Sequence, residues 1–302
     1  MDFFRDVVGV KYPVIQGGMA NIATGAFAAA CSNAGALGMI ASGGMDAEGL
    51  EKEIHICKKM TDKPFGVNLM LMNRHMPELA ELVVREGVKV LTTGAGSPAA
   101  YMDMWKGAGI TVIPVSSSVL LAARLVKAGA DAIIAEGTEA GGHVGEMTTM
   151  TLVPQMSDAL DVPVIAAGGI ADKRQVNAAF ALGAVGVQVG TCLLVSEECP
   201  IHDNYKQQIL KARDNSTTVT GRISGTPVRL IKNRMAREYL EMEAKGADKE
   251  ELERYTLGSL KKAVREGDVN YGSLMAGQVC GQLKEIRPVE EIIRELVSNA
   301  EF

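Results

Sequence analysis

From residue 13 to residue 191 the chain repeats one pattern, in which an apolar segment is followed by a helical segment and then by a glycine. The pattern predicts eight strands, at residues 13–15, 37–40, 65–69, 88–92, 111–115, 132–136, 164–167 and 186–189. They are short and apolar throughout, as expected of parallel strands that are covered on both faces. Their spacing is that of successive βα units, so the sequence predicts an α/β protein.

The predicted helix ends agree with this pattern. Glycines that fit the left-handed position after a helix precede five of the strands, at Gly35, Gly87, Gly109, Gly129 and Gly183. Asp46 and Asp172 stand where a side chain can cap the first turn of a helix. Ser97 followed by Pro98 predicts another helix start.

Eight βα units in succession predict a TIM (β/α)8 barrel. The competing architecture is an open, doubly wound sheet, which often carries a G-x-G-x-x-G turn after its first strand. Here that turn is Gln16-Gly17-Gly18-Met19, so the open sheet ranks second.

The pattern ends after Thr191. Residues 196–270 are more polar, look helical and show no further strand–helix alternation. We therefore expect residues 1–195 and 271–302 to form the barrel and residues 196–270 to form a smaller appended helical domain, a lid or substrate domain. Residues 288–297 predict a closing helix.

A cluster of basic residues without any acid lies in the appended domain, at Arg222, Arg229, Lys232, Arg234 and Arg237. One hypothesis is that these residues dock an acidic carrier protein or a nucleotide phosphate. A solvated helix face is the simpler interpretation and ranks higher on sequence alone.

Composition narrows the classes of function. The net charge of −5 and the low aromatic content of 4% argue against a nucleic-acid partner. The five cysteines are scattered without a CxxC pair, which predicts reduced thiols in a cytoplasmic protein. Residues 1–6 do not resemble a secretory signal, and no apolar run reaches the length of a membrane span.

In a barrel of this kind the active site lies at the carboxyl ends of the strands. The loop after the sixth predicted strand runs from Glu136 to His143 and includes Gly141 and Gly142. Histidine transfers protons readily near neutral pH, and glycines let a flat ligand approach the backbone closely. A lone histidine is more often structural, but this position favours a catalytic His143. We expect no metal, because no second histidine or cysteine stands at ligand spacing.

Glycines follow the seventh and eighth predicted strands, at Gly168, Gly169 and Gly190, the last being followed by Thr191. This fold commonly binds phosphate between these two loops, through backbone N–H groups. For one such loop a tight turn would be the preferred interpretation. Two adjacent loops favour a phosphate site.

Polar groups are also expected around the barrel mouth. Asn68, Gln188 and the backbone of Gly18 and Met19 could contact the edge of a heteroaromatic ring, and Glu136 could bind ribityl hydroxyls. For Asn68 alone, a purely structural role explains the residue equally well, with its amide hydrogen-bonded at the end of the strand. A ring over the barrel axis and a phosphate at the last two strands together match flavin mononucleotide (FMN).

Six motifs, in this order, resemble the nitronate monooxygenase/2-nitropropane dioxygenase superfamily, and within it most closely the flavin-dependent enoyl-acyl-carrier-protein reductases of type II. They are Gln16-Gly-Gly-Met19, Phe65-Gly-Val-Asn68, Thr92-Thr-Gly-Ala-Gly96, the stretch from Glu136 to His143, Ala166-Ala-Gly-Gly-Ile170 and Gln188-Val-Gly-Thr191. The resemblance covers nearly the whole chain and includes Met275-Ala-Gly-Gln278 near its end.

The resemblance implies a barrel with a helical lid and FMN at its mouth. The phosphate would bind Gly168, Gly169, Gly190 and Thr191, and the ribityl chain and ring would bind Asn68, Glu136 and Gln188. NADH or NADPH would supply hydride to reduce a trans-2-enoyl thioester, carried on acyl carrier protein or CoA, in fatty-acid elongation. His143 would help to protonate the α-carbon. We also expect a homodimer.

Two alternatives remain open. In the first, the chain is a nitronate monooxygenase that oxidises alkyl nitronates with O2. The residues after His143, from Val144 to Met150, and the Thr92–Gly96 motif resemble the reductases more closely. In the second, the barrel binds no flavin and acts on a phosphorylated metabolite at the same loops.

Overall fold

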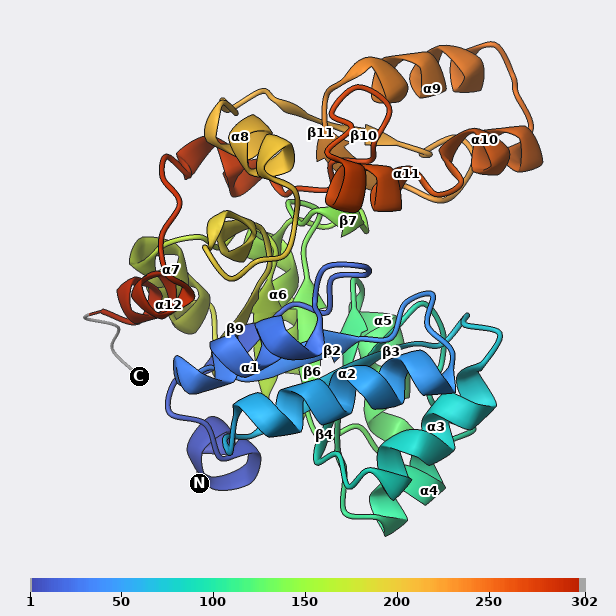
Figure 1. Cartoon of the computed structure of the whole chain (residues 1–302). Helices are drawn as coiled ribbons and strands as arrows, with labels where there is room; N and C mark the ends of the chain where they lie inside the picture. The colour runs from blue at the N-terminus through green and yellow to red at the C-terminus, as the bar shows by residue number, and fades with distance from the viewer. Residues whose placement is uncertain (1, 299–302) are drawn as a thin grey trace.

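The computed structural model describes residues 2–298 and contains a barrel of eight parallel strands surrounded by helices (Figure 1). In spatial order β1, β9, β8, β6, β5, β4, β3 and β2 lie side by side. The strands are β1 Val14–Gln16, β2 Gly38–Ala41, β3 Phe65–Met70, β4 Val90–Gly94, β5 Thr111–Ser116, β6 Ile133–Glu136, β8 Val164–Ala167 and β9 Gly186–Val189. The predicted barrel and all eight predicted strands are confirmed, with shifts only at the strand ends.

The helices around the barrel are α1 Gly25–Asn33, α2 Ala47–Met60, α3 Met76–Arg85, α4 Met102–Gly107, α5 Val119–Lys127, α6 Thr149–Ala159 and α7 Lys173–Ala181. The five predicted helix-ending glycines all have positive φ. Asp46 accepts a hydrogen bond from the Gly49 N–H, and Asp172 forms a capping box with Gln175. The helix start predicted at Ser97 is wrong, because residues 98–101 form a turn and α4 begins only at Met102.

The seam between β1 and β2 is held by few backbone contacts. The two strands are joined by one bridge, between Ile15 and Leu37. Beside it the Gln16 side chain, which is fully buried, accepts a hydrogen bond from the Met39 N–H through Oε1 at 3.1 Å. A side-chain amide thus satisfies a backbone donor that would otherwise be unpaired in the barrel wall.

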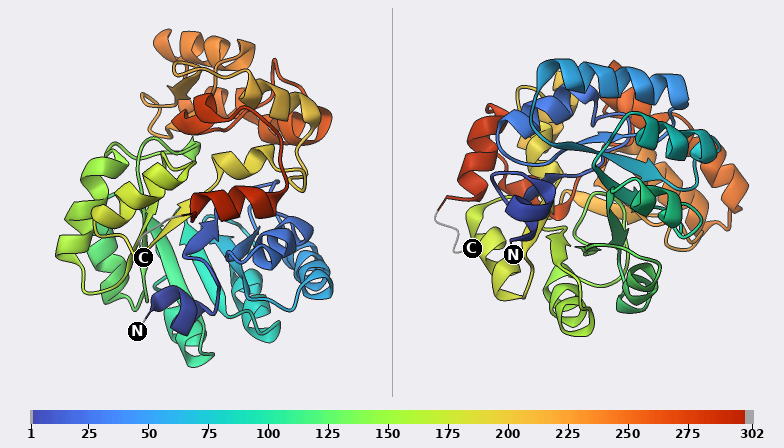
Figure 2. Two further views of the ribbon diagram at one scale, coloured as in Figure 1. Left: turned by 90° about the vertical axis from the view of Figure 1, so that its left-hand side faces the viewer. Right: turned by 90° about the horizontal axis from the view of Figure 1, so that it is seen from below.

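Apolar side chains fill the interior of the barrel. Ile15, Met39 and Ile134 belong to one buried cluster inside it. Phe4 and Val8, from the N-terminal helical segment Phe3–Val8, join the same cluster and close the end of the barrel opposite the appended region (Figure 2). Only the carboxyl ends of the strands are therefore left to form a binding site.

The appended region covers this open end (Figure 1). It contains α8 Asp203–Leu210, β10 Thr217–Thr220, β11 Val228–Ile231, α9 Arg234–Ala244, α10 Lys249–Thr256 and α11 Ser259–Lys261. The expectation that it has no strands is wrong. β10 and β11 form an antiparallel hairpin, and β11 also pairs with β7 Gly142–His143. The domain boundaries at residues 195 and 270 stay predictions.

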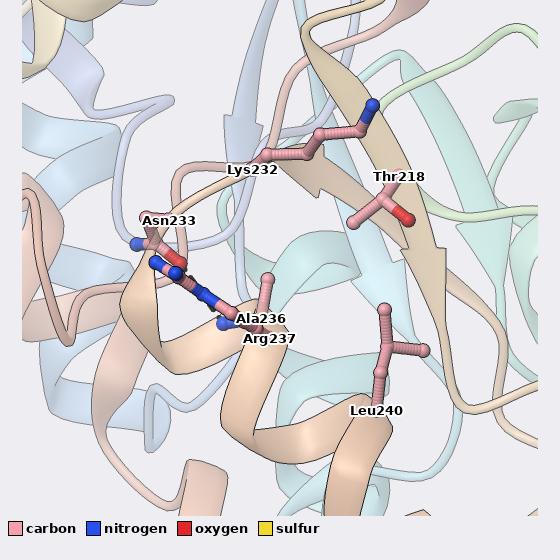
Figure 3. A pocket seen from close by; sticks show the side chains of 6 residues that line it. All are labelled: Thr218, Lys232, Asn233, Ala236, Arg237 and Leu240. Carbon is pink, nitrogen blue, oxygen red and sulfur yellow. Dashed lines mark hydrogen bonds between the residues drawn. The ribbon is translucent and has the colours of Figure 1, made fainter. Parts of the chain in front are cut away.

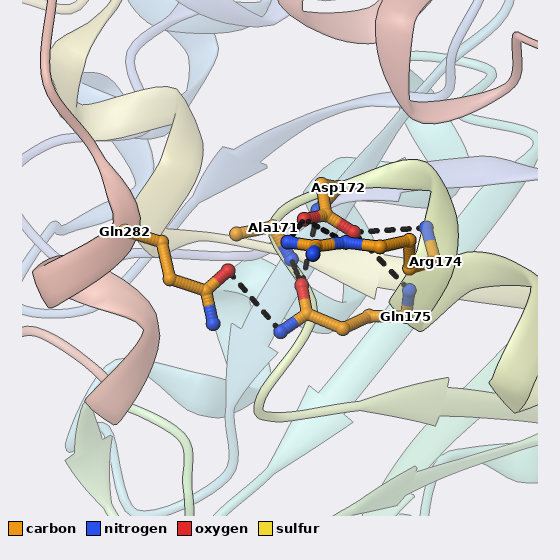
Figure 4. A network of polar contacts seen from close by, with 5 residues as sticks. All are labelled: Ala171, Asp172, Arg174, Gln175 and Gln282. Atoms are coloured by element: carbon orange, nitrogen blue, oxygen red, sulfur yellow. Dashed lines mark hydrogen bonds and ion pairs between the residues drawn. The ribbon is translucent and has the colours of Figure 1, made fainter. Parts of the chain in front are cut away.

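After the appended region the chain returns to the barrel. The predicted closing helix is confirmed as α12 Val289–Leu296, which packs against α1 and α7. Gln175 of α7 also donates a hydrogen bond to Gln282 at 3.3 Å, beside the capping interactions of Asp172 (Figure 4). Within residues 2–298 no helix combines the length and the apolar character needed to cross a bilayer.

The seam geometry predicts the effect of Gln16→Met. Methionine preserves most of the volume but leaves the Met39 N–H without its acceptor, so the free energy of unfolding should fall by about 1–3 kcal/mol. Urea denaturation of the ligand-free protein measures this change. Gln207→Met, at an exposed position of α8, is the control, and equal stability of the two variants would contradict this role of Gln16.

Candidate functional site

His143 lies where the barrel meets the appended hairpin. It belongs to β7, and its backbone is the register partner of Val228 in β11. The following Val144 N–H donates to the Pro227 carbonyl at 3.1 Å. Gly142 has a φ of +79°, which turns the loop toward the hairpin and is readily adopted only by glycine. The hairpin therefore fixes the backbone of the candidate catalytic residue.

The His143 side chain is suited to proton transfer. It is exposed at the rim, yet neighbouring protein removes part of its water, and this desolvation lowers the pKa below 6.5. The ring is therefore mostly neutral at pH 7 and offers one N–H donor and one acceptor nitrogen.

Glu139 holds the first half of the same loop. Its carboxylate accepts hydrogen bonds from the Thr149 N–H at 2.9 and 3.0 Å. A negative group is favourable there, because Thr149 is the first residue of α6. The Thr149 hydroxyl lies 3.0 Å from Glu139 and 2.8 Å from the Gly168 carbonyl. Glu139 thus positions this loop, and Thr149 adds a link to the loop after β8 that the sequence did not reveal.

Gly168 and Gly169 form a left-handed turn after β8, with φ values of +88° and +74°. A Cβ on Gly168 would lie 2.7 Å from the Gly137 carbonyl oxygen, and one on Gly169 would lie 3.3 Å from Cβ of Glu139. Side chains at these two positions would collide with or crowd the loop that leads to His143. The glycines are therefore required by packing as well as by turn geometry.

Gly190 and Thr191 lie at the neighbouring strand end. Gly190 precedes the short 3₁₀ helix Thr191–Val195. The Thr191 Oγ1 accepts a hydrogen bond from the Gly277 N–H at 2.9 Å. A Cβ on Gly141 would lie 2.8 Å from the Gly277 nitrogen. The segment around Gly277 thus joins the β6 loop to the β9 loop.

On the other side of the mouth, Asn68 of β3 donates to the Thr92 hydroxyl at 2.9 Å. Gly18 packs directly on Asn68, since a Cβ at Gly18 would lie 2.3 Å from Cβ of Asn68. Met19 lies against Gly190, where its sulfur would be 3.4 Å from an added Cβ. These contacts place Gly18, Met19 and Asn68 on one rim that continues to the β9 loop.

Strand register places Glu136 and Gln188 at the same level of the barrel. Glu136 pairs with Ala167, and Ala167 pairs with Gln188. Ile134 packs in the barrel interior, so Glu136, two residues later on the same strand, also points inward. Desolvation raises the pKa of Glu136 to about 7. Its carboxyl group is therefore balanced between its neutral and charged forms at physiological pH.

The basic cluster of the appended region does not act as a single surface. Arg229 is 6% exposed, and its guanidinium donates to the Thr138 carbonyl and the Thr217 hydroxyl, both at 3.1 Å. Arg222 pairs with Glu146 at 2.5 Å and Arg234 with Glu238 at 2.7 Å. Arg229 thus ties the hairpin to the His143 loop, and it is not available as an exposed docking residue.

Within the described residues, one group of side chains has metal-ligand spacing, Glu51, His55 and Glu86 on α2 and at the end of α3. Lys58 lies 2.8 Å from Glu86, and Arg85 lies 3.0 Å from Glu51. These cations already neutralise both carboxylates, so the group is explained as a surface ion-pair cluster away from the barrel mouth.

Comparisons with known proteins agree with the barrel fold. The nitronate monooxygenase family model matches residues 2–82 and 78–299. A solved structure of FabK from Thermotoga maritima is 45% identical with a TM-score of 0.95, covering 98% of this chain and 95% of that chain.

Two curated relatives carry different names. The (3aS,4S,5R,7aS)-5-hydroxy-7a-methyl-1-oxo-octahydro-1H-indene-4-carboxyl-CoA dehydrogenase of Rhodococcus jostii (strain RHA1) is 32% identical, covering 98% of this chain and 94% of the relative. A probable nitronate monooxygenase of Staphylococcus saprophyticus is 33% identical, covering 90% of each. The resemblance inferred from the six motifs is confirmed, and the chain belongs to the nitronate monooxygenase family.

Proposed function

We propose that this protein is an FMN-dependent oxidoreductase that uses NADH or NADPH to reduce trans-2-enoyl thioesters carried on acyl carrier protein or CoA. The observation that carries the proposal is the position of His143, which the hairpin holds at the rim above the glycine-rich ends of β8 and β9. The 45% identity to FabK, an enoyl-acyl-carrier-protein reductase of type II, supports the reductase assignment. The CoA thioester in the name of the Rhodococcus relative supports a thioester substrate.

The residues at the mouth fit FMN. Left-handed turns at Gly168 and Gly169 leave the backbone free of side chains where the fold commonly binds phosphate. Gly190 and Thr191 would complete the phosphate site, with Gly141 and Gly142 beside it. Asn68, Glu136 and Gln188, together with Gly18 and Met19, would contact the ribityl chain and the ring. Bound FMN would supply hydride transfer between the nicotinamide and the substrate.

Among the residues of the protein, His143 is the one that would take part directly in the chemistry. Reduction of the double bond places hydride on the β-carbon and leaves negative charge on the α-carbon and the thioester oxygen. The His143 imidazole can hydrogen-bond this oxygen or hold the proton that the α-carbon receives, either of which stabilises the charge as it develops. The backbone pairing of β7 with β11 keeps the ring at the rim, and positioning of this kind lowers the entropic cost of the step.

Nitronate oxidation with O2 is the second candidate. It is favoured by the name of the matching family model and by the Staphylococcus relative. The same histidine position could act on the nitronate. The residues that follow His143, beginning with Val144, favour the reductase, as does the higher identity to FabK.

One pair of assays separates the two candidates. The purified protein is incubated with NADH or NADPH and a crotonyl thioester without oxygen, and separately with an alkyl nitronate in air. Consumption of the thioester supports the proposal. Turnover of the nitronate alone assigns the second candidate, and a colourless preparation that binds no added FMN contradicts both.

Gly169→Asp should abolish FMN binding, because the side chain would crowd Glu139 and distort the turn assigned to the phosphate, and its carboxylate would add negative charge there. The flavin absorbance of the purified protein measures this loss. Gly87→Asp is the matched control, since Gly87 also has a positive φ of +67° but faces open space. Normal flavin occupancy in Gly169→Asp would contradict the assigned phosphate site.

His143→Ala should lower kcat for thioester reduction by about 10²–10⁴-fold while FMN stays bound, because only the proton-transfer group is removed. Anaerobic assays and the flavin spectrum measure the two effects. His55→Ala, on the outer surface of α2, should retain full activity. Unchanged turnover in His143→Ala would remove this residue from the mechanism.

Glu136→Gln should change how stability depends on pH. The folded-state pKa of Glu136, about 7, is raised above the usual 4.5, so the folded state binds the extra proton between these values. Stability from this group is therefore present below pH 4.5 and lost as the pH rises through 7. The glutamine variant should gain stability relative to the wild type over that interval.

Urea denaturation of the flavin-free protein at pH 5 and pH 8 measures this difference. Glu81→Gln, at an exposed position of α3, should show no such trend. A constant difference between the wild type and Glu136→Gln at both pH values would refute the raised pKa.

A further inference from the structure

The appended region contains a cavity of its own, between the β10–β11 hairpin and α9. Its volume is about 330 Å³, which lies at the lower end of the range for small-molecule sites, roughly 300–1,000 Å³. Figure 3 shows the side chains that line it, which are Thr218, Lys232, Asn233, Ala236, Arg237 and Leu240. The proposed reaction uses none of these residues, and Lys232 and Arg237 are the two members of the basic cluster that line a cavity.

The lining is positively charged and contains no acid, and the carboxylate that interacts with Arg237, that of Glu238, lies outside it. Lys232 and Arg237 carry two positive charges, and the other four lining residues are neutral. The nearby Glu238 is already engaged, since it accepts hydrogen bonds from Arg234 and from the Tyr255 hydroxyl, both at 2.7 Å. An anion would therefore meet no repelling carboxylate within the lining.

Hydrogen-bond donors remain free in this lining. Lys232 uses one N–H, on the Asn215 carbonyl at 2.7 Å, and an ammonium group has three donors. Across residues 2–298 the Arg237 side chain forms no hydrogen bond or ion pair, and neither does the Thr218 hydroxyl. In Figure 3 Lys232 extends toward Thr218, whereas Arg237 lies beside Asn233 at the start of α9. The Lys232 ammonium and the Thr218 hydroxyl thus lie on one side of the cavity, and the Arg237 guanidinium lies on the other.

The remaining lining is suited to an organic ligand. Ala236 and Leu240, one turn apart on α9, provide an apolar strip. The Asn233 side chain is committed to structure, because it donates to the Val269 and Gly272 carbonyls and caps α9. Free cationic donors next to apolar carbon are suited to a phosphate ester with an organic body.

Strand alternation separates this cavity from the His143 loop. Arg229 of β11 reaches the Thr138 carbonyl of the barrel, whereas its neighbour Leu230 packs with Met235 and Ala236 of α9. Thr218 is the register partner of Leu230 and lies on the same face. A ligand bound here would have its phosphate on the opposite face of the hairpin from the reaction.

We propose that the cavity between β10 and α9 binds a phosphate group of a ligand whose reacting end is remote from that phosphate. Two ligands of the proposed function carry such a phosphate, a CoA thioester and the nicotinamide nucleotide. In this respect the inference rests on the proposed function. Lys232 and Arg237 bind the phosphate, Thr218 donates a hydrogen bond to it, and Ala236 and Leu240 contact the adjoining carbon atoms.

The test uses the double variant Lys232→Gln/Arg237→Gln of the FMN-loaded protein. KM is measured anaerobically for crotonyl-CoA, for crotonyl-pantetheine, which has no phosphate, and for NADH and NADPH. The KM of the phosphate-bearing ligand that occupies the cavity should rise about tenfold or more, because two charged contacts are lost. The value of kcat should be unchanged.

The matched control is Lys245→Gln/Arg254→Gln, which removes the same charges from exposed positions of the appended region outside the cavity. A raised KM for crotonyl-CoA but not for crotonyl-pantetheine identifies CoA as the source. A raised KM for NADH or NADPH alone identifies the nucleotide. The proposal is overturned if every KM stays within twofold of the control, or if crotonyl-pantetheine is affected as strongly as crotonyl-CoA.

Binding measurements keep this test independent of the reaction. Isothermal titration calorimetry gives Kd for CoA and for NADP⁺ with the wild type, the double variant and the control. If the wild type reduces no enoyl thioester but the double variant alone loses binding, the proposed function fails and the phosphate site stands. If the wild type reduces crotonyl-CoA and the double variant binds both ligands like the control, the phosphate site fails alone.

Discussion

The pairing of β11 with β7 is the interaction on which the candidate active site depends. It joins two segments far apart in the sequence, residues 228–229 and residues 142–143. The Arg229 side chain strengthens the same junction, because it donates a hydrogen bond to the Thr138 carbonyl. A barrel loop of this length with two adjacent glycines would be mobile on its own. Because the hairpin adds strands to it, the position of His143 is determined by the appended region as much as by the barrel.

Contacts between neighbouring loops connect this junction to the rest of the mouth. Glu139 and Thr149 link the β6 loop to Gly168, and Gly277 links it to Thr191. Each link uses a hydrogen bond or a close contact that only glycine permits. The proposed phosphate turn and the histidine loop therefore belong to one packed unit. A substitution at any of these positions should disturb both, which is why the matched variants must separate ligand binding from folding.

The barrel could be predicted from the sequence because its information is local. Apolar strands and helix-ending glycines such as Gly129 and Gly183 recur along the chain, and each signal depends on a few adjacent residues. The hairpin could not be predicted in this way. β10 is polar and partly exposed, and β11 becomes a central strand only through its contact with β7. Its identity therefore depends on a partner about 85 residues earlier, and strand propensity is strongly affected by such context.

The same distinction explains the basic residues. They cluster in sequence, but the alternation of β11 and the pitch of α9 divide them. Arg229 faces the barrel and is buried, Arg222 and Arg234 form surface ion pairs, and only Lys232 and Arg237 line the cavity. Surface ion pairs contribute little stability, and a buried arginine is retained where its hydrogen bonds are satisfied. Lys232 and Arg237 form no surface ion pair within residues 2–298, and neither of them is buried. The two are exposed and lie beside one cavity, and the proposed phosphate would give them a common partner.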